Sequence, residues 1–505
     1  MNRMDVFFPL GESHVIYDME GDIGESYKIA GIFFTSYFNK QAYISSSIMS
    51  LMEGLLVFFA IISIYFLMVM FLHKLGILKK YNISLYGPAL LLRTKKGRTF
   101  LKKISDRKRF WKAYGSFGIV FCFVMMILMV IVLAKQVWIV SGFTPAQKEA
   151  LPGIEFSLIL PGINPILPLE YIAYILLALV VAVIVHEFSH GILTFASNLK
   201  VKSLGILYLV IPLGAFCEPD EEQLQKTKTS NRMRVYAAGP TSNFTVVLIS
   251  ILLFSFVFMP AVQNAADGIG IISIGEDTPA ERLGLKPGMI ITHINDTKIN
   301  TFYDFFIVMN NTWANQTVNI SYVGQDACIK SVVLSDKYYE YEKRNPGANN
   351  KSYVGKGYLG VGPNPFIDFL PILKNPFSNF PNSFLLFYIL PILGLDGYNP
   401  IYSPFTHSYI ITGPLSLIPS NIFWVIINAL YWIFWLNLAV GLFNVLPMIP
   451  LDGGFLFNDV IGSFIRRVKK GLSDERIEKI VKNVSLVTSL LILFIVLFPW
   501  LVKYF

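Results

Sequence analysis

The sequence predicts an α-helical polytopic membrane protein of about six transmembrane helices, with a small α+β domain inserted on the exterior side. Of its 505 residues, 54% are hydrophobic and only 15% are charged, whereas soluble domains carry about 25% charged residues. Six apolar runs reach the length of about 17 to 25 residues that a helix needs to cross a bilayer. They cover residues 51–72, 114–134, 171–195, 243–262, 420–443 and 484–501.

The N-terminal part fixes the expected orientation. Residues 1–46 hold six acidic and three basic residues and form an exterior segment. The two leading spans lie in 47–134 and enclose the loop 73–113, where thirteen Lys or Arg residues accompany one acid, Asp106. A basic loop between two spans marks the cytoplasmic side. The net charge of +9 is therefore explained by a cytoplasmic loop that can also contact anionic lipid. No nucleic-acid partner is expected.

The third span carries His186-Glu187-Phe-Ser-His190 near its cytoplasmic end. Residues four apart share one face of a helix, so the two imidazoles can bind one metal ion. Glu187 lies beside the first imidazole, where a carboxylate can take a proton from a metal-bound water. The alternative is a chance match at a helix end. It is disfavoured because each ionisable residue inside a membrane helix costs roughly 2.5 to 3.5 kcal/mol, so such residues usually have a function.

Residues 135–262 form the first part of the expected core and include the third and fourth spans. Between these spans, 198–236 is placed in the cytoplasm. Its apolar part, 205–216, is broken by a proline and a glycine, which predicts a strand or hairpin at the membrane face. Ala238-Gly-Pro-Thr-Ser-Asn243 is expected to open the fourth span.

Residues 263–345 form the expected insert, a soluble α+β domain between the fourth and fifth spans. Short β-like pieces cover 270–274 and 289–295. The stretch 277–284 reads as a short helix capped by its threonine or aspartate, and 302–311 as a second helix.

Residues 346–419 are the expected exterior or re-entrant connection to the fifth span. They contain a shorter apolar run, 383–394, that is interrupted by Pro391. The sequence leaves open whether this run spans the membrane or re-enters it.

The fifth span, in 420–460, leads into Asn444-Val-Leu-Pro-Met-Ile-Pro-Leu-Asp452-Gly-Gly. Two prolines and two glycines in so short a stretch cannot continue a regular helix. Irregular backbone at membrane depth persists only where protein or a cavity satisfies it. Asp452 is therefore expected in a constrained loop beside a polar site. Residues 461–505 hold a basic cytoplasmic segment and the final span.

A hydrolytic zinc site needs three protein ligands and an open position for water. The two histidines of the third span supply two ligands, and an acid or imidazole from elsewhere must supply the third. On the expected topology the other histidines are surface or interfacial residues; they are His14, His73, His293 and His407. Asp452 is the acid that combines a membrane location with a constrained loop.

The two motifs together resemble the site-2 protease family of intramembrane zinc metalloproteases (M50-type). The family pattern is His-Glu-x-x-His in a membrane helix, paired with a distant Asn-x-x-Pro-x-x-Pro-Leu-Asp-Gly-Gly. Ala238-Gly-Pro-x-x-Asn243 and a PDZ-like domain at the position of the insert are also features of that family, so the resemblance covers residues 160–460.

The resemblance implies a Zn²⁺ cofactor bound by His186, His190 and Asp452, with Glu187 as the catalytic acid and base. It implies substrate-binding roles for Asn444 and Asn243, although a helix N-cap is the alternative for the latter. The segment 205–216 would offer its edge to an unwound substrate.

The implied function is hydrolysis of peptide bonds within or near transmembrane segments, known as regulated intramembrane proteolysis. The expected partners are the lipid bilayer and single-pass membrane protein substrates that have already been cut once. The expected place is a prokaryotic, archaeal-type cell membrane, with the site in the cytoplasmic leaflet and the PDZ-like domain outside.

Three rival interpretations remain at this stage. One is the membrane zinc protease class with a glutamate on a later helix as third ligand, against which Leu451-Asp-Gly-Gly454 argues. The second is a catalytically silent PDZ-bearing scaffold, which the presence of Glu187 disfavours. The third is a metal transporter, which would carry further carboxylates or histidines along a path through the membrane.

Overall fold

The computed structural model describes residues 4–6, 15–17, 63–80, 83–86, 89–94, 97–149, 151, 164, 169–209, 211–324, 327–345, 347, 349–364, 369–393, 399–469 and 471–504. The chain divides into two compact units. One contains Ile251–Tyr431, and the other contains Leu169–Ser250 and Trp432–Phe505 together with the described residues between 63 and 151. Most of the predicted first span, and His14, lie outside the described residues.

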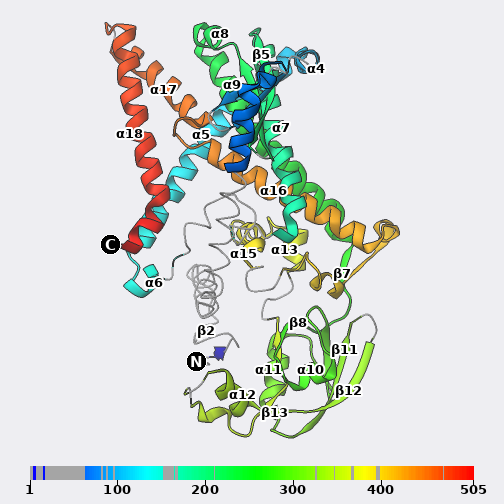
Figure 1. Cartoon of the computed structure of the whole chain (residues 1–505). Helices are drawn as coiled ribbons and strands as arrows, with labels where there is room; N and C mark the ends of the chain where they lie inside the picture. Colours follow the sequence, from blue (N-terminus) through cyan, green and yellow to red (C-terminus); the bar gives the residue numbers. More distant parts are fainter. Residues whose placement is uncertain are drawn as a thin grey trace. The chain divides into compact units, whose positions relative to one another are not determined.

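Five helices in the described residues are long and apolar enough to cross a membrane. They are α5 (Lys108–Ser141), α7 (Ile172–Ala196), the helix Thr229–Ala261 that begins with α9 (Thr229–Leu252), α16 (Ser420–Asn444) and α18 (Asp474–Leu501) (Figure 1). These helices match the second to sixth predicted spans. A shorter apolar helix, Ser63–Lys74, covers the described end of the first.

The surfaces of these helices are those of a protein embedded in lipid. Large apolar side chains point outward from α5, α7 and α18, for example Phe117 at 62% exposed, Leu177 at 46% and Val487 at 66%. A helix that is apolar all round is stable when it is buried in a membrane. The low charged fraction of the sequence is thereby explained.

The helix that carries the fourth span begins earlier than the predicted apolar run. The motif Ala238–Asn243 lies in the middle of α9, so it does not begin that helix. The helix continues through Pro240, which lacks a backbone N–H. Two hydroxyls next to the proline bond to carbonyls of the same helix, since Thr241 Oγ1 donates to Ala237 O at 2.6 Å and Ser242 Oγ donates to Gly239 O at 2.7 Å.

A four-stranded antiparallel sheet follows α7. Its order is β3 (Ile83–Tyr86), β4 (Ala89–Thr94), β5 (Val201–Leu209) and β6 (Ile211–Pro219). The hairpin predicted at 205–216 is confirmed as β5 and β6, and two strands of the basic loop extend it. Asn198, with a φ of 62°, turns the chain out of α7 towards β5. Among the described residues, β6 has a strand partner on one edge only.

The insert is a small α+β domain, as predicted. Its sheet runs in the order β12 (Ala327–Val333), β11 (Thr317–Val323), β9 (Ile290–Ile294), β8 (Ile269–Ile274) and β15 (Val361–Pro363), with β10 (Thr297–Lys298) paired to β9. β15 lies beyond residue 345, so the sheet extends past the predicted end of the domain. The domain has its own apolar core, which includes Ile271, Ile291, Ile294, Val318 and Ile320.

Both predicted helices of the insert are present and capped. α10 (Pro279–Leu283) follows Thr278, whose side chain accepts from the N–H of Glu281, so the threonine is the cap. α11 (Phe302–Asn310) follows Thr301, which forms a capping box with Asp304. These local signals are why sequence alone located both helices.

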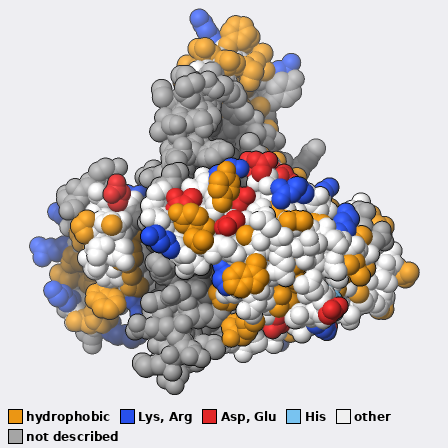
Figure 2. Space-filling view, turned by 90° about the horizontal axis from the view of Figure 1, so that it is seen from below, with side chains coloured by type: hydrophobic (Ala, Val, Ile, Leu, Met, Phe, Trp, Pro, Cys, Tyr) orange, Lys and Arg blue, Asp and Glu red, His pale blue; other side chains and the backbone are white. Residues whose placement is uncertain are grey.

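Charge is distributed over the insert as on a water-exposed domain. Ion pairs join Lys298 to Asp267 and Lys343 to Asp277, each at 3.4 Å, and all four side chains are at least half exposed. On the face shown in Figure 2, acidic, basic and apolar side chains are interspersed. A surface on which both signs of charge are interspersed suits contact with water.

The run 383–394 forms two short helices. α14 (Asn382–Tyr388) has seven residues and α15 (Leu390–Leu393) has four, so neither reaches spanning length. β7 (Val262–Asn264) pairs with β16 (Tyr409–Ile411), which brings together the two chain segments that flank residues 265–408.

Candidate metal centre

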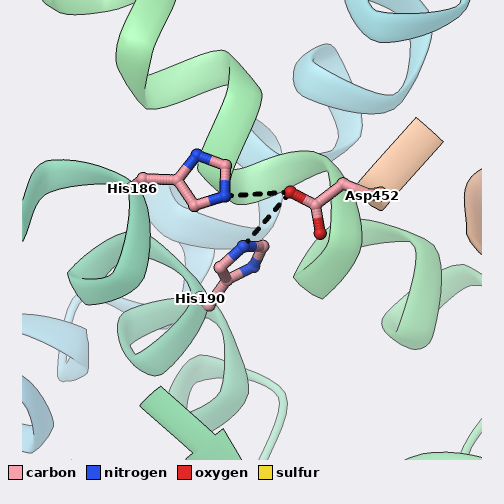
Figure 3. Close-up of side chains that lie close together, drawn as sticks. All are labelled: His186, His190 and Asp452. Atoms are coloured by element: carbon pink, nitrogen blue, oxygen red, sulfur yellow. Dashed lines mark ion pairs between the residues drawn. The ribbon is translucent and has the colours of Figure 1, made fainter. Parts of the chain in front are cut away.

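His186, His190 and Asp452 converge, although 262 residues separate the second from the third. The two histidines lie one turn apart on α7, and Asp452 is the first residue of α17 (Asp452–Val468). Asp452 Oδ2 lies 3.0 Å from His186 Nε2 and 3.3 Å from His190 Nε2 (Figure 3). Among the residues that the structure describes, this is the one group of three or more His, Cys, Asp or Glu side chains with converging ligand atoms.

Hydrogen bonds at Nδ1 orient both imidazoles. His186 Nδ1 bonds to Asn243 Oδ1 at 2.7 Å, and His190 Nδ1 bonds to Val235 O at 2.7 Å. The carbonyl can only accept. Asn243 Oδ1 is also the acceptor, because Nδ2 of the same amide donates to Asn437 Oδ1 at 3.0 Å. In the neutral imidazoles the proton is therefore on Nδ1, and the lone pair on Nε2 faces Asp452.

These residues fit a bound cation. Asp452 Oδ2 is buried and has no hydrogen-bond donor among the described residues. The Nε2 atoms of His186 and His190 that face it are ordered as acceptors, and three converging lone pairs repel one another without a positive charge between them. Zinc bonds of about 2.0 to 2.2 Å place neighbouring ligand atoms roughly 3.3 Å apart in a tetrahedral site, close to the two distances observed.

Gly239 leaves the space in which such an ion would lie. A Cβ at this position would stand 2.4 Å from His186 Nε2 and 2.6 Å from His190 Nε2. Real Cβ atoms do not approach other atoms that closely. The residue on α9 that faces both Nε2 atoms must therefore be glycine.

Two more glycines set the position of Asp452. α16 ends at Asn444, and the chain turns before α17 begins, as the sequence predicted. A Cβ at position 453 would lie 2.3 Å from Val445 O, and one at position 454 would lie 2.6 Å from Met448 O. The first turn of α17 thus packs directly on the backbone of the preceding turn, which only Gly453 and Gly454 permit.

Glu187 is close to the cluster in sequence but is not part of it. Its Oε2 accepts the backbone N–H of Cys217, in β6, at 2.8 Å. The side chain is half-buried on α7, one residue after His186. It is therefore available for proton transfer rather than committed as a ligand.

The two asparagines that were both predicted to bind substrate, Asn243 and Asn444, have different surroundings in the structure. Asn243 is fully buried, and its amide contacts His186, Asn437 and the carbonyl of Ala182. Its position inside α9 contradicts the N-cap alternative, and its hydrogen bond to His186 favours a role in orienting that imidazole. Asn444 is half-buried at the end of α16 and donates to Val440 O at 3.0 Å.

The sequence did not reveal three groups at this centre. The Val235 carbonyl carries no signal because every residue has one. Gly239 stands in a motif that the sequence did single out, but its role depends on how α9 packs on α7. Asn437 could have been noticed, because it is a polar residue in the apolar run 420–443 and such residues are usually paired.

Residues 174–492, more than half of the chain, match the model of peptidase family M50. The chain belongs to peptidase family M50. This is the site-2 protease family that the two motifs resemble. The predicted enzyme class and cofactor are therefore confirmed: this M50 chain is a multi-pass membrane metalloendopeptidase that uses zinc and acts on membrane proteins within the bilayer.

Individual relatives are distant. An uncharacterized protein of Methanocaldococcus jannaschii is 25% identical over 380 residues, which are 75% of this chain and 79% of the relative. The zinc metalloprotease RasP of Oceanobacillus iheyensis is 24% identical over 242 residues, which are 47% of this chain and 53% of that protein. The solved PDZ domain of an SdrC-like protein from Listeria monocytogenes matches 20% of this chain and 93% of its own at 19% identity, with a TM-score of 0.16. The PDZ-like character of the insert stays a prediction.

Substituting Gly239 tests whether the space beside the histidines is used. Gly239→Ala should abolish zinc retention, because its methyl group would stand against both Nε2 atoms. Gly462→Ala, in α17, is the matched control, since a Cβ there makes only ordinary contacts of 3.6 Å. Zinc per chain, measured on purified protein, should fall to the background level in the first variant and stay at the wild-type level in the second. Equal zinc in both would contradict the assignment of this space.

Proposed function

We propose that His186, His190 and Asp452 bind the zinc ion of this M50 protease and that Glu187 performs proton transfer during peptide hydrolysis. The observation that carries the proposal is the convergence of three potential ligand atoms on largely buried side chains, beside a carboxylate that is not one of them. Zinc, when bound, polarises the scissile carbonyl and lowers the pKa of a water from 15.7 to about 7.

In this proposal each residue of the chain has a defined task. The Nδ1 hydrogen bonds hold the imidazoles of His186 and His190 with Nε2 directed to the ion. Glu187 takes the proton of the attacking water and delivers it to the leaving amine. Asn444, at the end of α16, positions the substrate backbone.

The edge of β6 is the proposed docking strand for the substrate. A peptide bond in a transmembrane helix is protected by its own hydrogen bonds, so the substrate must unwind before cleavage. Its freed N–H and C=O groups can pair with an unpartnered strand edge. The edge of β6 suits this role, because Cys217 of this strand directs its N–H at Glu187. A substrate strand there would lie next to the proposed catalytic carboxylate.

We place the site in the cytoplasmic leaflet, with the insert on the exterior side. Fifteen residue steps separate Tyr171 from His186, which is roughly 22 Å along a helix. Lys200 follows this span, and Arg466 to Lys470 follow the Asp452 motif; basic flanks mark the cytoplasmic side. We further propose that the substrates are single-pass membrane proteins that have already been cut once and that the process is regulated intramembrane proteolysis. The proposed location is a prokaryotic, archaeal-type cell membrane.

Single substitutions of Glu187 and of Asp452 distinguish a proton-transfer residue from a metal ligand. Glu187→Gln should keep its zinc while turnover of a membrane-embedded peptide falls by about 10²- to 10⁴-fold. Asp452→Ala should lose both zinc and activity. Zinc content and initial rates in detergent or liposomes give the readout. Normal turnover in Glu187→Gln, or full zinc retention in Asp452→Ala, would refute the corresponding role.

We propose that the insert acts as a filter that captures the ends or strands of substrates which have already lost their ectodomain. Removing the insert tests this role. β8 and β15 are paired, with Ile271 opposite Pro363, so the two ends of the domain lie side by side and a short linker can replace Gly268–Pro363. The deletion should leave zinc content unchanged and allow cleavage of substrates that still carry their full ectodomain. The ratio of rates for full-length and trimmed substrate should approach one. Continued exclusion of the full-length substrate would argue for a passive ectodomain.

Single cysteines test the proposed orientation. The positions are Lys200 and Lys469, both exposed at the proposed cytoplasmic face, and Ile329, which is 74% exposed on β12 of the insert. In a background without the native cysteines, an impermeant thiol reagent applied outside intact cells should label Ile329→Cys and spare Lys200→Cys and Lys469→Cys. Labelling should reverse in inside-out vesicles. The opposite pattern would invert the topology.

A further inference from the structure

A second pair of residues joins α9 to α17, two helical turns from the proposed ligand Asp452. Arg232 Nε lies 2.9 Å from both carboxylate oxygens of Asp459, and Nη2 of the same guanidinium also bonds Oδ1. The two side chains are only 13% and 10% exposed. A nearly buried bidentate pair of this kind has a single well-defined geometry, because both partners are planar and their loss of hydration on burial is offset only when they are paired.

The pair is one step of a regular series between two helices that run in opposite directions. Arg232 contacts Asp459, and one turn further along α9 the ring of Tyr236 stacks on Phe455 with centroids 5.1 Å apart. The next turn of α9 presents Gly239 to the histidines. On α17 the corresponding positions are Asp459, Phe455 and Asp452, at helical spacings of four and three residues. Two successive turns of α9 therefore meet two successive turns of α17, and the next position on each helix lies at the proposed metal centre.

α9 also fixes the other two proposed ligands. Its Val235 carbonyl accepts from His190, and its Asn243 amide accepts from His186. The histidines are thus held relative to α9 by their Nδ1 atoms. Asp452 has no such hydrogen bond of its own among the described residues, since its Oδ2 is without a donor. Its position must come from the helix that carries it.

We propose that Arg232 and Asp459 are positioning residues, which fix α17 on α9 so that Asp452 meets His186 and His190 at metal-binding distance. The inference rests on the ligand assignment proposed above. Arg232 and Asp459 would act on the ligands only through the placement of α17. Groups bonded directly to metal ligands typically contribute 10- to 100-fold to metal affinity or activity, and we expect misplacement of a ligand to cost a similar factor. Neither residue touches substrate or metal.

The test compares three variants with one control. Arg232→Gln and Asp459→Asn each break the pair, and each leaves one buried charge alone, so their stability will also fall. The double variant Arg232→Gln/Asp459→Asn removes both charges and with them that penalty. The control is Arg234→Gln: Arg234 lies on the same helix, but it bonds Ser116 of α5 rather than α17.

Two measurements are made on each protein: zinc affinity by chelator competition, and the midpoint of thermal unfolding of the zinc-free form. Positioning predicts zinc affinity about 10- to 100-fold weaker in both single variants and equally weak in the double variant. The unfolding midpoint of the double variant should recover towards wild type. Where zinc binds, kcat for a membrane-embedded peptide should fall while KM stays unchanged. Arg234→Gln should retain wild-type zinc affinity.

Three outcomes would overturn the proposal. One is wild-type zinc affinity in the double variant. Another is recovery of zinc affinity together with the unfolding midpoint, which would mean that the pair only stabilises the fold. The third is an equal loss of affinity in Arg234→Gln. Asp452→Ala distinguishes failure of the positioning proposal from failure of the ligand assignment. If Asp452→Ala also keeps all its zinc, the ligand assignment itself is wrong.

Discussion

The proposed metal centre depends on one constraint: three groups with lone pairs must be held together in a largely buried place. Such a cluster is unfavourable unless each member is fixed by a partner and a cation lies among them. α9 provides most of this support. It gives His190 a carbonyl from Val235, gives His186 the amide of Asn243, and leaves room with Gly239. The same helix contacts α17, whose first residue is Asp452.

The polar network extends into the apolar helices without exposing polar atoms to lipid. Asn243 and Asn437 are fully buried and bond to each other, while the outward faces of α5, α7 and α18 are apolar. A buried amide whose hydrogen bonds are made is tolerated in a membrane, and it also resists rotation, since turning it would break those bonds. The network thus gives His186 a rigid orientation at little cost in solvation.

Glu187 links the proposed chemistry to the proposed substrate strand. Its carboxylate accepts an N–H from β6, whose outer edge carries no strand among the described residues. A carboxylate in that position is oriented before a substrate arrives. In the mechanism we propose, a peptide paired with β6 would run alongside the group that transfers its proton, so docking and catalysis would share one strand.

The sequence by itself determined the elements with strong local or compositional signals. Apolar runs located five of the described helices, turn and cap residues located α10 and α11, and the spacing of His186 and His190 placed two imidazoles on one face. Pro447 and Pro450 predicted that the helix of the fifth span ends before Asp452. Tertiary structure alone decided that α9 starts at Thr229, that Asn243 faces His186, and that Arg232 meets Asp459. The two contacts depend on the rotation of each helix about its axis and on the depth at which it packs against its neighbours. An apolar helix in lipid has no strongly amphipathic pattern to reveal its inner face, so its sequence reports that it spans the membrane but not which side chains will meet.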